Sequence, residues 1–238
     1  MSHTRWKWSA AVSLFGEILI YSSVVKVKLV GKWLSLWKFE RIYRELLLRS
    51  LREVSLVRQE DIALECEVSL GLVNKIVRKL EAAKAVEATR KGVRVLSPGR
   101  LLNLWAAERD IEKDVYQSFR LDPLEDVEKE LPGDVLVTGF SGWSIVSGRR
   151  PAEYNRLYFY VVNMASFDLW FGFRKSRVRR VNPNVFVLRV DDDHLVRSSE
   201  RGVVSVPQLY ADIYSAGGPS APPFLRDITL VYKSLSLW

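Results

Sequence analysis

The clearest pattern along the chain is a helical one that runs from residue 70 to residue 83. Apolar residues recur there at the i, i+3, i+4, i+7 spacing of a helix that buries one stripe, and these residues are Val73, Ile76, Val77 and Leu80. A shorter apolar pattern predicts a second helix over residues 59–66. Ser69 stands between the two patterns, where its hydroxyl can accept hydrogen bonds from free backbone N–H groups of the next helix. The sequence therefore predicts two short helices joined by a tight turn.

The segments on either side of this helix pair complete a known order of elements. Residues 38–53 have helical spacing, and residues 85–97 alternate apolar and polar side chains on both sides of Lys91-Gly92. Gly92 can supply the positive φ that a tight hairpin turn needs. A winged helix-turn-helix has this order: a helix, a short helix, a tight turn, a recognition helix and a hairpin wing. We therefore expect such a domain over residues 38–100.

Two positions depart from the usual chemistry of such a turn. Glu67 stands where Gly is usual, and Arg58 stands where a Ser or Thr cap is usual. Both residues weaken the turn without breaking the pattern.

The charge of the chain indicates an anionic partner. Its 238 residues carry a formal net charge of +8. Nucleic acid is the first candidate for the partner, and a membrane surface is the second. The basic excess is concentrated between Ser69 and Arg100, on the two elements that would touch DNA. The alternative, a winged helix that serves as a protein-interaction module, stays open.

We expect the helix from Ser69 to Lys84 to enter a major groove. Gly71, Asn74 and Lys75 would approach base edges, the basic residues one turn later would reach phosphates, and the wing tip would contact the DNA backbone or the minor groove. The expected DNA-binding residues are Ser69, Gly71, Asn74, Lys75, Arg78, Lys79, Arg90 and Lys91.

The rest of the chain predicts a basic extension, a linker and a second domain. Residues 1–37 form the extension, in which alternating valines and lysines predict a strand with one basic face. Residues 101–131 are acidic, and a long helix from Pro98 to Phe119 would link the two domains. Residues 132–238 alternate strand and helix signals, which indicates a mixed α/β domain. The expected strands there are 134–139, 156–162, 167–173 and 184–190. The expected helices are 206–218 and 222–235.

Three groups of side chains in the second domain are candidates for a metal-binding or catalytic site. Asp191, Asp192 and Asp193 could hold Mg²⁺, because hard cations prefer clustered carboxylates. Consecutive side chains at a strand end point in different directions, however, so we expect a solvated turn. His194 has no evident catalytic partner in the sequence. Residues 139–144 match neither a phosphate-binding loop nor a nucleophile elbow.

A dense basic run near residues 174–180 offers a second charged surface. Its members are Arg174, Lys175, Arg177, Arg179 and Arg180. The run could contact phosphates or an acidic protein, or it could be a solvated loop, and charge patterning leaves these alternatives open.

Several short motifs together carry a resemblance to a known family. They are the Thr138-Gly139 step, the Arg150-Pro151 step before the "LYFYV" strand, and the run "VSVPQLYADI" from Val204 to Ile213. With these motifs the chain, over about residues 38–237, resembles the AbiEi-type antitoxins. Those proteins are winged helix-turn-helix regulators of bacterial and archaeal type IV toxin–antitoxin systems. In the last motif, Ser205 and Gln208 have the spacing of a capping box.

The resemblance implies that the second domain is of nucleotidyltransferase-like character. Active nucleotidyltransferases pair a Gly-Ser helix start with two carboxylates on a nearby strand, which hold the metal ions. The strand from Leu157 to Val162 has no carboxylate, and Asp168 is alone on its predicted strand. We therefore expect this domain to be catalytically empty.

Composition excludes some kinds of site. A single cysteine, Cys66, excludes an internal disulfide and a cysteine-based zinc cluster, and only two histidines are present. The apolar stretch from Ala10 to Val25 is shorter than a bilayer span and carries Glu17, so no transmembrane helix is expected. Scarce Met and Cys beside many Val, Arg and Glu are typical of a thermophilic source.

These patterns predict an α+β protein that is a cytoplasmic DNA-binding transcriptional regulator and not an enzyme. Its expected partners are double-stranded DNA, a second copy of the chain and a cognate toxin protein, with no membrane, cofactor or metal. An antitoxin-like autoregulator of its own operon fits this description. The alternatives are a metal-dependent nucleotidyltransferase that uses Asp168 and Asp191 to Asp193, and a protein-interaction or RNA-binding module.

Overall fold

The computed structural model describes residues 38–52, 56–190 and 192–234. The chain divides into two compact units, Met1–Lys38 and Phe39–Trp238, and the elements below belong to the second. The extension over residues 1–37 and its predicted strand lie outside the described residues. In the described ranges, none of the helices has the length and apolar character needed to cross a bilayer.

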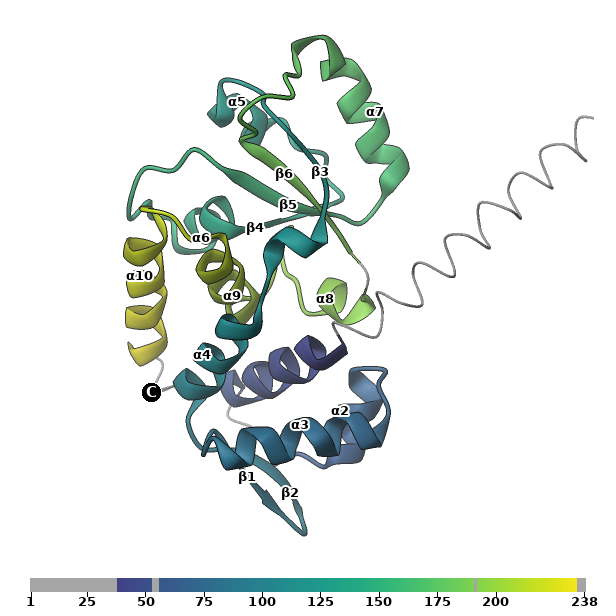
Figure 1. Ribbon diagram of the computed structural model, residues 1–238, viewed down its shortest axis with the longest axis vertical. Helices are drawn as coiled ribbons and strands as arrows, with labels where there is room; N and C mark the ends of the chain where they lie inside the picture. The colour runs from purple at the N-terminus through teal and green to yellow at the C-terminus, as the bar shows by residue number, and fades with distance from the viewer. Residues whose placement is uncertain (1–37, 53–55, 191, 235–238) are drawn as a thin grey trace, which may run out of the picture. The chain divides into compact units, whose positions relative to one another are not determined.

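The N-terminal part of the described unit begins with a helix over residues 38–51, followed by two shorter helices and a hairpin (Figure 1). The shorter elements are α2 (Gln59–Glu65), α3 (Leu70–Ala82), β1 (Val86–Thr89) and β2 (Gly92–Val95). α3 buries the predicted stripe, which consists of Val73, Ile76, Val77 and Leu80. The predictions of two short helices and a hairpin are therefore confirmed.

The turn between α2 and α3 forms without the glycine that is usual there. Glu67 adopts a left-handed φ of 52°, the conformation that Gly reaches most easily. Its carboxylate accepts a hydrogen bond from Arg197 Nη1 at 3.0 Å, and Arg197 Nη2 donates to the carbonyl of Glu65 at 2.9 Å. Arg58 makes no side-chain cap, whereas Ser69 Oγ caps α3 as predicted. An arginine from far along the chain thus braces a turn that lacks its usual glycine.

The β1–β2 hairpin turns through Arg90 and Lys91, one residue earlier than predicted. Gly92 has a φ of +147°, and a Cβ atom there would lie 2.5 Å from the carbonyl oxygen of Val57. Val57 also pairs with Val93, so the segment before α2 runs beside the hairpin. Gly92 is therefore required both by its backbone conformation and by this close approach.

In the C-terminal part, four strands within the described residues form one sheet in the order β3-β6-β5-β4. The strands are β3 (Val115–Phe119), β4 (Val135–Thr138), β5 (Leu157–Val161) and β6 (Val185–Arg189). The central strands β5 and β6 run parallel, and the edge strands pair antiparallel with them. The chain is therefore a mixture of helices and strands, which confirms the predicted α+β composition.

Helices cover both faces of this sheet (Figure 1). α5 (Leu124–Lys129) and α7 (Met164–Arg174) lie on one face, and α6 (Gly139–Ser147) and α9 (Val206–Ala216) lie on the other. The remaining helices of this part are α4 (Pro98–Glu108) and α10 (Ala221–Ser234), which pack on α9, and α8 (Asp193–Arg197). Neighbouring residues of a strand point to opposite faces. Phe159 therefore packs against α5 and α7, while Tyr158 joins the core of α6 and α9. That second core also contains Val77 and Val93, so apolar packing is continuous from the hairpin to the sheet.

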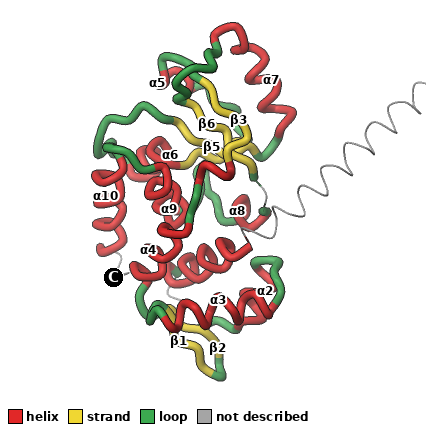
Figure 2. The backbone as a smooth tube through the Cα atoms, in the orientation of Figure 1, coloured by secondary structure: helices red, strands yellow, loops and turns green. Residues whose placement is uncertain are grey.

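The helix predicted from Pro98 to Phe119 is wrong in its second half. α4 ends at Glu108, a 3-10 turn η1 covers Ile111–Asp114, and the chain then enters β3 (Figure 2). At Arg109 the backbone leaves the helical conformation for an extended one, and the side chain turns into the protein and is buried. Part of the segment 101–131, predicted as a helical linker, therefore belongs to the sheet.

The strand predicted over residues 167–173 is also wrong, because these residues lie in α7. Asn163 caps this helix by accepting backbone hydrogen bonds at its start. Phe167 and Trp170, three residues apart, are buried on one side. An apolar run rich in aromatic residues is compatible with a strand or a helix, and here the cap and the three-residue spacing of burial favour the helix.

We expect Gly92→Ala to lower the free energy of unfolding by about 2 kcal/mol or more, because the new Cβ would meet the Val57 carbonyl at a strained φ. Urea denaturation followed by circular dichroism measures this change. Gly172→Ala in α7 is the matched control, since nothing lies within 4 Å of the added Cβ. Alanine should stabilise that helix by about 0.5–1 kcal/mol. Equal stability of the two variants would contradict the role assigned to Gly92.

Candidate nucleic-acid interface

The outer face of α3 carries small, polar and basic side chains. Gly71, Lys75 and Arg78 are exposed and Asn74 is half-buried. Their spacing of three and four residues places them on one side of the helix, opposite the buried stripe. The structure therefore brings together four of the residues that the sequence predicts to contact DNA.

A groove of about 900 Å³ runs beside this face. Its walls come from the first turn of α2, the first turns of α3 and the tip of the β1–β2 hairpin. Leu70, Asn74, Arg90 and Lys91 are among the lining residues. Residues from α3 and from the hairpin, predicted separately to contact DNA, thus share one concave surface.

Four basic side chains on α3 and at the hairpin tip are not neutralised by the protein. Lys75, Arg78, Arg90 and Lys91 are exposed, and none of their side chains makes an ion pair or a hydrogen bond with another described residue. Arg94 on the same hairpin differs, because its Nη2 pairs with a glutamate on β1 at 2.6 Å. Four cations therefore remain free to meet an anion.

Lys79 and Ser69, also predicted to contact DNA, make contacts within the protein. Lys79 Nζ pairs with Glu108 Oε1 of α4 at 2.5 Å. Ser69 Oγ accepts a hydrogen bond from the backbone N–H of Leu72 at 3.3 Å. Lys79 therefore ties α3 to α4, and the Ser69 hydroxyl serves the start of its own helix.

Two carboxylates lie at one edge of the groove. Glu60 and Asp61 are exposed in the first turn of α2 and line the groove. Acidic groups are favourable at a helix N-terminus, but they repel phosphates. Arg58, just before α2, is an exposed cation at the same edge, so this edge is mixed in charge, whereas Lys75, Arg78 and the hairpin tip offer a polyanion free cations.

The second predicted basic patch lies at the end of α7 and around the 3-10 turn η2 (Lys175–Arg177), away from the hairpin (Figure 1). Arg174 pairs with Glu130 Oε2 at 2.6 Å and lies over the ring of Trp170 at 4.6 Å. Arg177 Nη2 donates to the carbonyl of Asp122 at 3.2 Å. These two arginines therefore have structural partners.

The remainder of this patch is open to solvent. Lys175, Arg179 and Arg180 are exposed, and their side chains have no partner among the described residues. Leu169 and Phe173, on the outer side of α7, are 68% and 84% exposed. The end of α7 thus offers a surface that is cationic and apolar, on a different element from the α3 groove.

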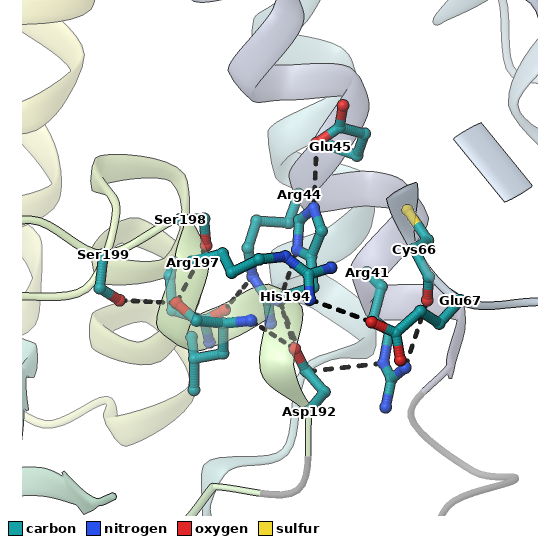
Figure 3. Close-up of polar contacts among 12 residues, drawn as sticks. Arg41, Arg44, Glu45, Cys66, Glu67, Asp192, His194, Arg197, Ser198 and Ser199 are labelled. Carbon is teal, nitrogen blue, oxygen red and sulfur yellow. Dashed lines mark hydrogen bonds and ion pairs between the residues drawn. The ribbon is translucent and has the colours of Figure 1, made fainter. Parts of the chain in front are cut away.

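A buried polar cluster joins the helix 38–51 to α8 and α9. Figure 3 shows Arg44 between Asp192 and His194, and its Nη1 donates to Asp192 Oδ1 and to His194 Nδ1, both at 3.1 Å. Its Nε donates to Gln208 Oε1 at 2.9 Å. Because His194 Nδ1 accepts, the ring carries its proton on Nε2, which donates to Glu45 Oε2 at 2.9 Å. Burial alone would raise the pKa of Asp192, but the Arg44 guanidinium holds that pKa below its usual value.

A second buried cluster lies against the sheet. Arg109 Nε donates to Asp212 Oδ1 and Arg109 Nη2 donates to the Tyr160 hydroxyl, both at 2.8 Å. Asp212 also accepts from Thr138 Oγ1 at 2.7 Å, from Tyr160 at 3.1 Å and from Gln208 Nε2 at 2.9 Å. Asp212 is fully buried, so its carboxylate is occupied by hydrogen bonds within the protein.

The predicted capping box at the start of α9 is wrong. Gln208 is buried and bonds to Arg44 and Asp212 instead of returning to Ser205. Ser205 makes no side-chain cap, and its Oγ has no hydrogen-bond partner among the described residues. The buried charges attract the carboxamide more strongly than the helix terminus does.

The carboxylates considered for a metal ion are dispersed. Asp168 is exposed on α7 rather than on a strand. Asp192 is buried and caps α8, Asp193 is exposed, and Asp191 lies outside the described residues. Among the residues that the structure describes, no three His, Cys, Asp or Glu side chains are grouped so that they could hold a metal ion.

The sequence pattern does not predict the two buried clusters. Glu40, Arg41, Arg44 and Glu45 have the spacing of a wet helix face, yet all four are buried. Asp192 and His194, two of their partners, lie more than a hundred residues further along the chain, where no periodicity could point to them. One sequence signal could have indicated their burial. The same helix has an unusually wide apolar stripe, which leaves little of its surface exposed to water.

No model of a known protein family, no curated protein and no solved structure matches this chain.

The charge of Glu40 generates a pH-dependent stability. Burial, which takes the carboxylate out of water, raises the pKa of Glu40 from 4.5 to about 7. The Arg109 guanidinium offsets this only in part, because Asp114 and Asp212 share it. A raised carboxyl pKa stabilises the fold below pH 4.5, and this contribution is lost as the pH rises toward 7. We expect the loss to be on the order of 3 kcal/mol. Glu40→Gln, which cannot ionise, should remove this part of the pH dependence.

Urea unfolding at several pH values between 5 and 8 measures the free energy of unfolding over the range in which Glu40 loses its proton. The pKa values of Glu45 and Asp192 are lowered, so their contributions change at more acidic pH and do not overlap. Glu153→Gln is the control, because this exposed carboxylate pairs only with an arginine three residues away among the described residues. The same pH dependence in the wild type and in Glu40→Gln would refute the assignment.

Proposed function

We propose that the protein is a DNA-binding transcriptional regulator with a winged helix-turn-helix, in which α3 is the recognition helix and the β1–β2 hairpin is the wing. One observation carries this proposal. Arg90 and Lys91 line the groove, and Lys75 and Arg78 lie on the same face of α3 as Asn74. None of these four cations has a side-chain partner among the described residues. Free cations beside a polar helix face suit a duplex, whose phosphates meet the cations while its base edges meet the helix.

In this proposal the N-terminal half of α3 enters the major groove. Gly71 has no side chain, and nothing lies within 4 Å of the position of its missing Cβ, so the duplex can come close to the helix backbone. Asn74 and Lys75 would reach base edges, and Arg78 would reach a phosphate. The hairpin tip would contact the DNA backbone or the minor groove.

We also propose that the second half is a nucleotidyltransferase-like domain without catalytic activity. β4 leads directly into α6 through Gly139, whose φ is +63°. The neighbouring strand β5 carries Tyr158 and Tyr160, where an active enzyme would carry metal-binding carboxylates. Asp212 reaches this place from α9, but its carboxylate is buried and saturated with hydrogen bonds.

The proposed regulator acts in the cytoplasm as a homodimer, since helix-turn-helix proteins commonly read paired half-sites. It would serve as an antitoxin-like autoregulator of its own operon, with a toxin as a protein partner. Leu169, Phe173 and the cations near the end of α7 offer a protein partner a surface outside the α3 groove.

DNA binding tests the proposal through matched arginine and lysine variants. We expect Arg78→Ala and Arg90→Ala each to weaken binding to a duplex from the protein's own promoter. Each should also lower the slope of log affinity against log salt by about 1, because each removes one phosphate contact. Fluorescence anisotropy at several salt concentrations measures both quantities.

Lys175→Ala and Arg180→Ala are the controls, because they remove the same charge from the patch near α7. These controls should keep the affinity and the salt slope of the wild type. Equal losses in both sets would show that net charge alone drives binding, and wild-type binding by Arg78→Ala and Arg90→Ala would refute the assigned interface.

A further inference from the structure

The groove beside α3 holds side chains that phosphate binding does not require. Leu56 and Leu70 line it and are 39% and 46% exposed. Gln59 and Asn74 line it as well, and Asn74 Nδ2 donates to Gln59 Oε1 at 3.5 Å. The groove therefore combines aliphatic and carboxamide groups with the surrounding cations.

Leu70 occupies a position where an aliphatic side chain has a specific use. It is the first residue of α3, and its side chain lies in the groove rather than in the core. Residues at the start of a recognition helix are those that meet base edges. Among the base edges of a major groove, the C5 methyl of thymine is the apolar group. An exposed leucine at this position therefore matches thymine.

Asn74 lies one helical turn after Leu70, on the same side of α3. The rise between them is about 6 Å, so the two side chains would address neighbouring base pairs. A carboxamide donates and accepts at once, which matches the N6 amino group and the N7 atom of adenine. The contact with Gln59 uses one N–H of Asn74 and leaves its second N–H and its oxygen for a base.

The charges around the groove orient the duplex so that bases, and not phosphates, meet Leu70 and Asn74. Glu60 and Asp61 repel phosphates from the first turn of α2. Arg58 also lines the groove at this edge, and the other free cations lie further along α3 and on the hairpin tip. Phosphate strands would follow those cations, which places the base edges over the groove between them.

We propose that this groove reads adjoining A·T base pairs, with Leu70 on a thymine methyl and Asn74 on adenine N6 and N7. The inference rests on the proposed function and names the duplex sequence that the same site would prefer. Gln59 is a positioning residue here, because it acts through Asn74.

Chemical changes in the DNA test the contact of Leu70 without altering the protein. The full chain selects its preferred duplex from a random library, and each thymine is then replaced in turn by deoxyuridine, which deletes one methyl group. One such replacement should weaken wild-type binding about fourfold, the value of one buried methyl group. Leu70→Ala should show a similar loss on the unmodified duplex and no further loss on the uracil duplex.

Leu64→Ala is the matched control, since Leu64 is 81% exposed on α2 and does not line the groove. This variant should keep the full sensitivity to uracil. A parallel pair tests Asn74: 7-deazaadenine, which lacks N7, should weaken wild-type binding about tenfold and leave Asn74→Ala unaffected. The wild-type comparison of thymine with uracil depends on no variant folding correctly.

The outcomes distinguish failure of DNA binding from failure of the proposed base contacts. If the chain selects no duplex, the proposed function fails. If it selects a duplex that tolerates uracil and 7-deazaadenine at every position, or one without A·T pairs at its centre of contact, DNA binding stands and the reading by Leu70 and Asn74 is overturned. Sensitivity to uracil that persists in Leu70→Ala would also overturn the assignment of that residue.

Discussion

The buried guanidinium groups of Arg44 and Arg109 connect the two halves of the described unit. A buried arginine costs several kcal/mol unless carboxylates and other acceptors surround it. Arg44 of the helix 38–51 meets Asp192 and Gln208, and Arg109 meets Asp212. Because these partners come from distant parts of the chain, the clusters are complete only when that helix, α8 and α9 are all in place. A shift of any one element would leave a buried charge without its counter-charge, so the clusters favour a single arrangement of the two halves.

This arrangement couples the α3 groove to the sheet. The helix 38–51 packs in the same apolar core as α2, α3 and the hairpin, and Arg41 Nη1 donates to the carbonyl of Cys66 at the end of α2 at 3.2 Å. Glu108 of α4 accepts from Tyr43 of that helix and from Lys79 of α3. The elements around the groove are thus held by the elements that carry the buried charges. If α3 reads DNA as proposed, its orientation is set by the sheet half of the unit and not by a free tether.

Local features of the fold follow from the sequence, whereas features that depend on distant partners do not. The stripe of α3, the Ser69 cap and the hairpin are each encoded within a few residues, and their predictions are confirmed. The helix predicted to Phe119 fails because Arg109 turns inward to bind Asp212, a residue 103 positions away that no local pattern reveals. The strand predicted over residues 167–173 is wrong because a run of aromatic residues looks apolar at both the helical and the strand spacing. The capping role predicted for Gln208 fails for a similar reason, because its buried partner Arg44 is remote in the sequence.

In the candidate site, too, local features could be predicted from the sequence and features that depend on distant residues could not. Spacing alone places Gly71, Asn74, Lys75 and Arg78 on one face of α3, and the structure does place them there. Spacing cannot tell a free cation from a paired one: Lys79 is adjacent to Arg78 and also cationic, yet it pairs with Glu108. Nor can it show that Leu70, which continues the apolar pattern of the helix, lies in the groove instead of the core. Leu70 is 46% exposed beside unpaired cations, and covering it with an apolar partner would be favourable. The proposed explanation is that its apolar partner is a thymine methyl group on the DNA.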